Sequence, residues 1–248
     1  MQLTNFFKQN PRAAIAFSGG VDSAYLICAA RNAGADVTAY LVCSAFQPQF
    51  EWEDAERLAA QLGIRLRILS ADVLEDPRIA ANPQNRCYFC KRRLFAVILT
   101  AASQDGYSLV LDGTNASDDV SDRPGFLALQ ELGVRSPLRE CGLTKTEIRR
   151  LSREAGLFTW DKPAYACLAT RIPAGEPITA EKLQITERAE AFLRSLGFRD
   201  FRVRMRGRTA RLQLREEDLP LLLQCRETIL STLRRDYDGV TLDLEVRT

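Results

Sequence analysis

The chain has 248 residues, of which 46% are hydrophobic and 27% are charged, and its formal net charge is +2. This composition is that of a globular protein with one large or two modest domains, and the charge gives no case for a nucleic-acid or anionic-membrane surface. The sequence contains no histidine, which excludes histidine-based catalysis and histidine metal sites.

Strand and helix patterns alternate through the first half of the chain. The apolar runs and alternations predict strands at 13–17, 36–42, 64–69 and 108–111, separated by helices at 21–32, 51–62 and 91–103. Such alternation is typical of an α/β fold with a doubly wound parallel sheet. No signal peptide or membrane-spanning apolar run is recognisable, so we expect a cytoplasmic protein.

The second half has a different pattern. A helix is predicted at 144–155, with Thr144 as its cap and Glu147 three residues later. The irregular stretch 159–177 follows, and we place the domain boundary there, between a domain of residues 1–165 and one of residues 166–248. Helices at 179–196 and 219–235 and strands at 201–205, 210–214 and 240–246 predict that the smaller C-terminal domain is α+β.

The sequence FSGGVDS follows the first predicted strand and opens a helix. A glycine turn at this place presents backbone N–H groups and the positive end of a helix to a phosphate. Asp22 is an acid beside the expected polyphosphate, and we predict that it binds Mg²⁺. The predicted nucleotide contacts are Ser18, Gly19, Gly20, Val21, Asp22 and Ser23, with Gly113 and Thr114 after the fourth strand, where an ordinary turn is equally compatible.

Seven cysteines in a chain without a recognisable secretion signal indicate thiol, metal or catalytic chemistry rather than a disulfide framework. Cys87 and Cys90 form a CxxC pair, which suits a redox pair, half of a zinc site or cluster ligands. Cys167 lies between Lys162 and Arg171, two cations that would favour its thiolate. Three thiolates would leave one iron of a 4Fe–4S cluster open to an external sulfide.

Several segments together resemble one family: AFSGGVDS, NRCYFCKRRLF, DGTNASDDVSDRPG, KPAYACLATRIPAGEPIT and RAEAFLRSLGFRDFRVRMRG. SGGVDS matches the SGGxDS motif of the PP-loop ATP pyrophosphatases. Over nearly its whole length the chain resembles the LarE family, ATP-dependent sulfur transferases that act on a pyridinium-3,5-biscarboxylic acid mononucleotide during synthesis of a nickel-pincer cofactor. This resemblance implies a PP-loop domain at 1–165 and a substrate-binding and oligomerisation domain at 166–248.

The resemblance also implies a mechanism and a set of residues. ATP and Mg²⁺ would adenylate a substrate carboxylate with release of pyrophosphate, and sulfur would then displace AMP. Cys167 matches the cysteine that gives up its own sulfur in some members, whereas others hold a 4Fe–4S cluster with that cysteine and a CxxC. Because Cys87 and Cys90 are present, we favour the cluster form, with Cys87, Cys90 and Cys167 as its ligands.

Substrate contacts are implied in the second domain. Glu190, Arg202 and Arg204 match family positions near the phosphate and carboxylates of the substrate, and paired guanidiniums suit a phosphate. A solvated basic strand is the alternative. Arg123 is a further candidate anion ligand. We expect a small-molecule nucleotide substrate that carries carboxylates, a sulfide donor, a homo-oligomer and no membrane or nucleic-acid partner.

Three other functions fit parts of the pattern. A PP-loop tRNA thiolase also combines SGGxDS with cluster cysteines, and the RVRMRGRTAR stretch is its best support, although the net charge opposes it. An ammonia-dependent ligase would have no use for Cys87, Cys90 and Cys167 together. A non-catalytic nucleotide-binding regulator is the third alternative.

Overall fold

The structure is a computed structural model that describes residues 2–119 and 124–247. The chain folds into two compact units. The first contains the chain up to Val73 together with Asn85–Lys162, and the second contains Leu74–Gln84 together with the chain from Pro163 onward. No helix in the described ranges is long and apolar enough to cross a membrane.

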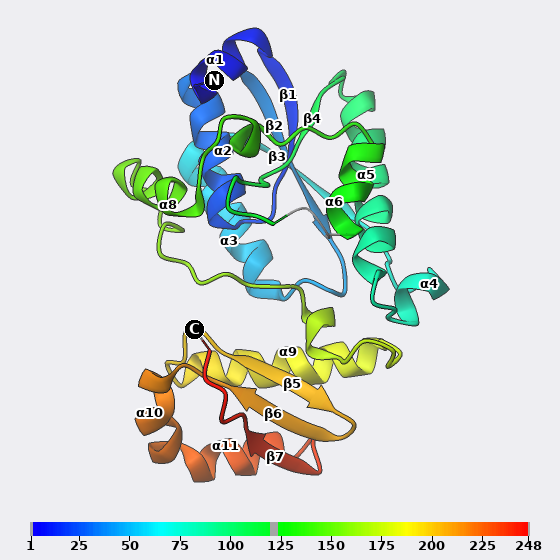
Figure 1. Cartoon of the computed structure of the whole chain (residues 1–248), viewed down its shortest axis with the longest axis vertical. Coiled ribbons are helices and arrows are strands. Elements are labelled where there is room, and N and C mark those ends of the chain that lie inside the picture. The colour runs from blue at the N-terminus through cyan, green and yellow to red at the C-terminus, as the bar shows by residue number, and fades with distance from the viewer. Residues whose placement is uncertain (1, 120–123, 248) are drawn as a thin grey trace. The chain divides into compact units, whose positions relative to one another are not determined.

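A four-stranded parallel sheet with the order β3-β2-β1-β4 forms the centre of the first unit (Figure 1). Its strands are β1 (Arg12–Ala16), β2 (Asp36–Cys43), β3 (Arg65–Ser70) and β4 (Val110–Leu111). The central strands are apolar on both faces, because helices cover both sides of a parallel sheet. Ile15 and Leu41 face one side, whereas Ala14 and Tyr40 face the other, and all four are fully buried.

Helices cover the two faces of this sheet in separate layers (Figure 1). One layer packs with Ile15 and contains α1 (Leu3–Gln9), α2 (Val21–Asn32), α3 (Gln49–Leu62), α7 (Pro137–Glu140) and α8 (Lys145–Glu154). The other packs with Tyr40 and contains α5 (Arg86–Gln104) and α6 (Pro124–Glu131). The predicted α/β class with a doubly wound parallel sheet is confirmed.

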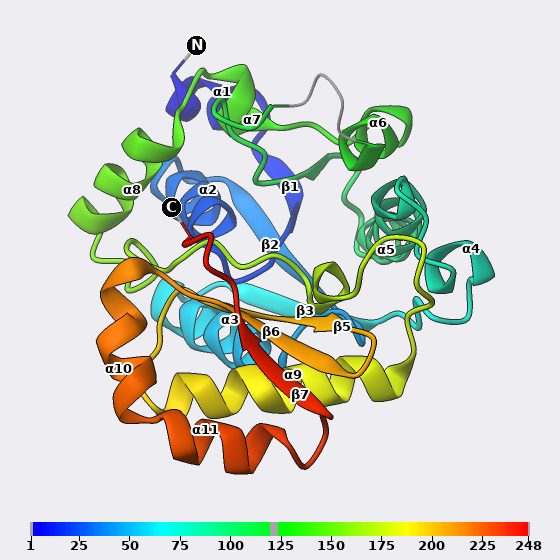
Figure 2. The ribbon, with the colours of Figure 1, turned by 60° about the horizontal axis from the view of Figure 1, so that its bottom comes forward.

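The second unit contains a three-stranded sheet with the order β5-β6-β7 (Figure 2). Its strands are β5 (Arg202–Arg206), β6 (Thr209–Gln213) and β7 (Gly239–Leu242), and its helices are α9 (Ala180–Ser195), α10 (Leu219–Gln224) and α11 (Arg226–Leu233). β5 and β6 are antiparallel, whereas β6 and β7 are parallel. This arrangement agrees with the expected α+β pattern.

The two faces of the second sheet differ in polarity. Val203 and Met205 of β5 pack with α9 and α11 in an apolar cluster. Because side chains alternate along a strand, Arg202 and Arg204 lie on the opposite face. The strand pairing sets Arg204 opposite Arg211. One face is therefore the core, and the other carries guanidinium groups.

The segment Leu74–Gln84 belongs to the second unit through backbone contacts. It contains the short helix α4 (Pro77–Ala80), and Asn82 follows with a φ of 54°. Asn82 donates through Nδ2 to the Pro173 carbonyl at 2.8 Å and accepts at its own carbonyl from the Gly175 N–H at 2.8 Å. Nothing in the local pattern indicated this pairing, because its partners lie some ninety residues away.

Some element boundaries differ from the sequence expectation. α5 begins at Arg86, earlier than expected, so Cys87 and Cys90 lie in its first turns. α6 was not expected, because its apolar sequence PGFLALQE has no polar face that would mark a helical period. The predicted helix at 219–235 is two helices that meet at Cys225, and β7 ends at Leu242.

Helix α9 gives a test of capping. Thr179 accepts at its hydroxyl from the Lys182 N–H at 3.2 Å, as the sequence predicted. Thr179→Ala should lower the free energy of unfolding by about 1 kcal/mol, because the N–H loses its side-chain acceptor. Urea titration measures this change. Thr228→Ala, at an exposed site inside α11, is the matched control and should leave the midpoint unchanged. Equal midpoints for both variants would contradict the capping role.

Candidate functional site

The turn between β1 and α2 leaves the first N–H groups of α2 without a side-chain cap. Gly20 is the N-cap residue, and among the described residues no side chain bonds to the first turn of the helix as a cap. Ser23 donates through its hydroxyl to the Gly20 carbonyl at 3.3 Å and lies 3.3 Å from the Ser18 hydroxyl. The helix of twelve residues therefore presents backbone donors and a positive terminus to an anion.

Two glycines of this region permit close packing of backbone against backbone. Gly19 has a φ of 69°, and a Cβ on it would lie 3.0 Å from the Glu51 carbonyl oxygen of α3. A Cβ on Gly113 would lie 3.0 Å from the N atom of Ser23. Only glycine satisfies both positions without displacing a helix. α3 and the chain after β4 thus hold the turn from two sides.

Asp22 has partners from two distant segments. Its Oδ2 atom lies 2.5 Å from Nζ of Lys145, and its Oδ1 atom accepts from Nδ2 of Asn115 at 3.3 Å. Mg²⁺ in nucleotide sites commonly uses one or two carboxylates and takes its other ligands from phosphates and water. The single carboxylate of Asp22 fits that requirement.

A second lysine reaches the same turn. Nζ of Lys162 lies 2.7 Å from Oδ2 of Asp54 and donates to the Gly19 carbonyl at 3.4 Å. The sequence interpretation assigned Lys162 to the surroundings of Cys167, whereas the structure places its ammonium at the glycine turn. Asn115 was expected only as a residue of the turn after the fourth strand, and Lys145 and Asp54 had no predicted role, because nothing in local sequence signals a contact between residues so far apart in the chain.

Gly113 and Thr114 lie beside the turn, as expected for residues that follow a neighbouring strand. Thr114 donates through its hydroxyl to Asp112, and Ser136 donates to the other carboxylate oxygen of Asp112 at 2.6 Å. Gly113 has the packing role described above. Their contacts with a nucleotide stay predictions.

Cys87 and Cys90 share one face at the start of α5, because they are three residues apart in a helix. Cys87 is exposed, and its Sγ lies 3.7 Å from Nη2 of Arg86. All seven cysteines of the chain are thiols rather than disulfides. In the described ranges no three side chains of Cys, Asp or Glu come together as a metal site. The CxxC pair alone supplies two of the three ligands of the predicted cluster.

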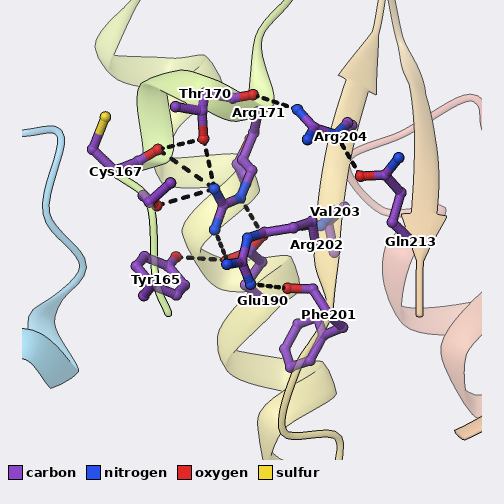
Figure 3. Close-up of polar contacts among 12 residues, drawn as sticks. Tyr165, Cys167, Thr170, Arg171, Glu190, Phe201, Arg202, Val203, Arg204 and Gln213 are labelled. Carbon is purple, nitrogen blue, oxygen red and sulfur yellow. Dashed lines mark hydrogen bonds and ion pairs between the residues drawn. The ribbon is translucent and has the colours of Figure 1, made fainter. Parts of the chain in front are cut away.

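Cys167 precedes a short 3-10 helix, η1 (Leu168–Arg171), in the second unit. Its carbonyl accepts from the Thr170 N–H at 3.0 Å and from the Thr170 hydroxyl at 2.8 Å. Figure 3 shows the sulfur pointing away from the charged residues that surround this backbone. The segment 164–171, which we call the cysteine segment, is thus fixed through its backbone while the thiol is turned outward.

A buried ion pair anchors the cysteine segment (Figure 3). Arg171 and Glu190 are each 1% exposed, and Glu190 accepts from Nε of Arg171 at 2.6 Å and from Nη2 at 3.1 Å. Glu190 also accepts from the Tyr165 hydroxyl at 2.5 Å and from the Val203 N–H at 2.9 Å. One carboxylate therefore joins α9, β5 and both ends of the cysteine segment.

Arg202 and Arg204 attach the same segment to the polar face of the sheet (Figure 3). Arg202 donates to the carbonyl of Ala164, and Arg204 donates through Nη1 to the carbonyl of Thr170 at 2.8 Å. Arg202 is only 5% exposed and Arg204 is partly buried, whereas Arg206 at the end of β5 is exposed, so solvent reaches only part of this basic strand.

The guanidinium groups of this face repel one another. Burial, with repulsion from Arg171 and Arg247, lowers the pKa of the Arg202 guanidinium to about 10. The same causes lower the pKa of Arg204. Burial, together with the charge of Glu190, raises the pKa of Tyr165, which therefore stays a hydroxyl donor. A face on which cations destabilise one another is electrostatically suited to an anion.

The predicted site residues thus fall into separate groups. The first unit contains the glycine turn, Gly113, Thr114, Cys87 and Cys90, and the second contains Cys167, Glu190, Arg202 and Arg204. Arg123 lies outside the described residues. The catalytic, metal and substrate roles assigned to these residues stay predictions.

Comparison with known proteins decides the family. No family model matches the chain. A pyridinium-3,5-bisthiocarboxylic acid mononucleotide synthase of Lactiplantibacillus plantarum is 34% identical over 240 residues, which cover 96% of this chain and 87% of that protein. The chain belongs to the LarE family. An uncharacterized protein of Synechocystis sp. is 41% identical over 98% of this chain and 92% of its own length.

More distant relatives share part of the LarE chain. The tRNA-specific 2-thiouridylase MnmA of Salinispora arenicola is 30% identical over 188 residues, which cover 61% of this chain and 52% of that enzyme. The resemblance to LarE proteins, the PP-loop fold class and the prediction of an ATP-dependent sulfurtransferase are confirmed. The tRNA-specific 2-thiouridylase, which represents the thiolase alternative, is thus similar to this chain but matches a smaller part of it than the synthase does.

The buried ion pair gives a second test. Glu190→Ala should lower the free energy of unfolding by about 3–5 kcal/mol, because it leaves the Arg171 guanidinium buried without its carboxylate. Chemical denaturation measures this loss. Arg208→Ala, which breaks the exposed pair with Asp238, is the matched control and should leave the free energy of unfolding unchanged. Equal effects of the two substitutions would contradict the anchoring role of Glu190.

Proposed function

We propose that this chain converts a carboxylate of pyridinium-3,5-biscarboxylic acid mononucleotide into a thiocarboxylate at the expense of ATP. The observation that carries the proposal is the match of 96% of the chain to a synthase whose name gives the corresponding bisthiocarboxylic product. A match of this length includes both units, and therefore more than the ATP-binding part that the thiouridylase shares.

The first step is adenylation of the carboxylate. A carboxylate oxygen attacks the α-phosphorus of ATP, a new O–P bond forms, the bond between the α-phosphorus and the bridging oxygen breaks, and pyrophosphate leaves. The uncapped first turn of α2 would bind the departing phosphates through Ser18–Ser23, and Asp22 would hold Mg²⁺. We assign this step to a domain of residues 1–165, with Gly113 and Thr114 beside the nucleotide.

The second step is sulfur transfer. A thiolate or sulfide attacks the acyl carbon, and AMP leaves as the carbon–oxygen bond breaks. Sulfur is a strong nucleophile, so the step needs no histidine base. We place Cys167 at this step, because the cysteine segment is anchored through its backbone while the thiol points away from the anchor.

Two sulfur sources fit the chain. In the first, Cys167 forms a thioester with the substrate and then loses its Cα proton and its Cβ–S bond, which leaves dehydroalanine and the thiocarboxylate. In the second, Cys87, Cys90 and Cys167 would hold a 4Fe–4S cluster, which would supply a sulfide brought by a donor. The presence of the CxxC pair favours the cluster.

The substrate would bind through its anionic groups in a domain of residues 166–248. Arg202 and Arg204 lie on a face where guanidinium groups repel one another, so a phosphate or carboxylate there would relieve the repulsion. Glu190 has all its observed contacts within the protein, and we assign it to the position of Arg171 and the cysteine segment. Arg123 is retained as a candidate anion ligand. We further propose a homo-oligomer in a reducing cytoplasm, to which seven thiols are suited.

The intact mass of the protein before and after turnover distinguishes the two sources. The sacrificial route predicts the loss of about one H₂S equivalent per chain, mapped by peptide analysis to Cys167. The cluster route predicts an unchanged mass over many turnovers. A reaction without ATP is the control and should leave the mass unchanged. Loss of sulfur from any other cysteine would contradict the assignment of Cys167.

The cluster can be tested at its exposed ligand. After anaerobic reconstitution with iron and sulfide, Cys87→Ala should lose the bound iron and the visible absorbance that the unaltered chain acquires. Cys225→Ala is the matched control, because Cys225 lies between α10 and α11, and it should keep both. Iron content and turnover that are unaffected by Cys87→Ala would remove the cluster from the mechanism.

A further inference from the structure

We propose that Lys145 and Lys162 are the cations of the phosphate site, supplied by segments remote from the glycine turn and held on Asp22 and Asp54 until a nucleotide binds. The inference rests on the proposed function, in that it takes the glycine turn to be the place of the ATP phosphates. It adds two binding residues that SGGVDS does not contain.

The turn itself is short of positive charge. Between Arg12 and Arg31 the sequence contains no lysine or arginine, and Asp22 adds a negative charge. Arg12 is engaged elsewhere, because its Nε lies 3.1 Å from Oδ2 of Asp36. The terminus of α2 contributes the equivalent of about half a positive charge. A departing pyrophosphate carries several negative charges, so this turn needs cations from outside.

Lys145 is one such cation. It is the first residue of α8, and its Nζ lies 2.5 Å from Oδ2 of Asp22 although the two residues are 123 positions apart. Its place is fixed by the fold, because its N–H donates to the Ser117 hydroxyl at 2.9 Å and Ile148 of the same helix lies in the core that includes α2. The ammonium is partly exposed, with 31% of its side-chain surface open to solvent.

Lys162 is the other cation, and it contacts a different part of the turn. Its Nζ contacts Oδ2 of Asp54 at 2.7 Å and the carbonyl of Gly19 at 3.4 Å. Arg149 of α8 holds the backbone of this stretch by donating to the carbonyls of Trp160 at 2.6 Å and Lys162 at 2.8 Å. Helix α8 therefore positions Lys162 through Arg149, just as it positions Lys145 at its own first residue.

Asp22 and Asp54 compensate the charges of the two ammonium groups while no anion is bound at the turn. Each lysine has a carboxylate partner, so neither charge lies partly buried without compensation. With a nucleotide and Mg²⁺ bound, Asp22 would hold the metal ion in place of the Lys145 ammonium, and Lys145 would turn to an oxygen of the departing pyrophosphate. Lys162 makes the corresponding exchange from Asp54. Each ammonium keeps one anionic partner throughout, and Asp22 keeps a cationic one.

Binding of inorganic pyrophosphate with Mg²⁺ to the full chain tests this proposal, with AMP as the second ligand. Titration calorimetry should give an affinity for pyrophosphate that is about tenfold to a hundredfold weaker in Lys145→Gln and in Lys162→Gln, which is the effect of losing one charged hydrogen bond. The affinity for AMP should stay within about twofold, because AMP lacks the β- and γ-phosphates, which leave as pyrophosphate and to which we assign these lysines. Lys8→Gln, at an exposed site on α1, is the control and should change neither affinity.

Asp54→Asn separates phosphate binding from a structural role of the ion pair. It removes the partner of Lys162 and leaves the ammonium in place, so pyrophosphate should bind as tightly as in the unaltered chain or more tightly. If the pair only supports the fold, Asp54→Asn and Lys162→Gln would weaken binding alike, and the proposal fails. This comparison also holds if Lys145→Gln does not fold.

The remaining outcomes separate the two proposals. If the unaltered chain binds pyrophosphate and both lysine variants bind it equally well, this inference is wrong and the proposed function stands. An equal loss of affinity for AMP and for pyrophosphate in the lysine variants also overturns it. If the unaltered chain binds neither ATP nor pyrophosphate, the proposed function fails and this inference fails with it.

Discussion

The backbone of the glycine turn is packed so closely that a Cβ on Gly19 or Gly113 would push against neighbouring backbone, and the geometry of the first unit depends on this contact. α3 lies against Gly19, and the chain after β4 lies against Ser23 through Gly113. Because the turn is held by backbone, the first N–H groups of α2 need no side-chain cap to define their position. They remain available to a ligand, because no N-cap side chain occupies one of them.

Both units place positively charged side chains where an anion is expected. The partners that stabilise these charges while no anion is bound differ between the units. Lys145 and Lys162 are paired with carboxylates that sit beside the turn. Arg202 and Arg204 donate to backbone carbonyls of the cysteine segment, and Oδ1 of Asp200 lies 3.6 Å from Nη1 of Arg202, yet the guanidiniums lower one another's pKa. In the second unit, electrostatic repulsion is retained in the fold, and the carboxylates of Glu190, Asp200 and Asp243 limit it.

The absence of histidine is consistent with the chemistry that the LarE family performs. Adenylation uses phosphate binding and metal coordination, and sulfur attacks without a general base. The functional residues proposed for this chain are accordingly a turn, a few cations and a thiol whose backbone is fixed. The backbone of Cys167 is fixed through Thr170, Arg171 and Glu190, and the reactions proposed for its sulfur stay predictions.

The sequence determined the parts of this protein whose signals are local. Alternating apolar runs gave the parallel sheet, Thr144 and Thr179 marked the helix starts, and SGGVDS with ACLATR indicated the family. Only the tertiary structure decided which side chains meet: Lys145 with Asp22, Lys162 with Asp54, and Arg171 with Glu190. A helix cap or a strand period involves neighbours in the chain, so it can be recognised from spacing. A lysine that crosses from α8 to α2 is indistinguishable in sequence from a solvated one, because its partner is fixed only by how the helices pack.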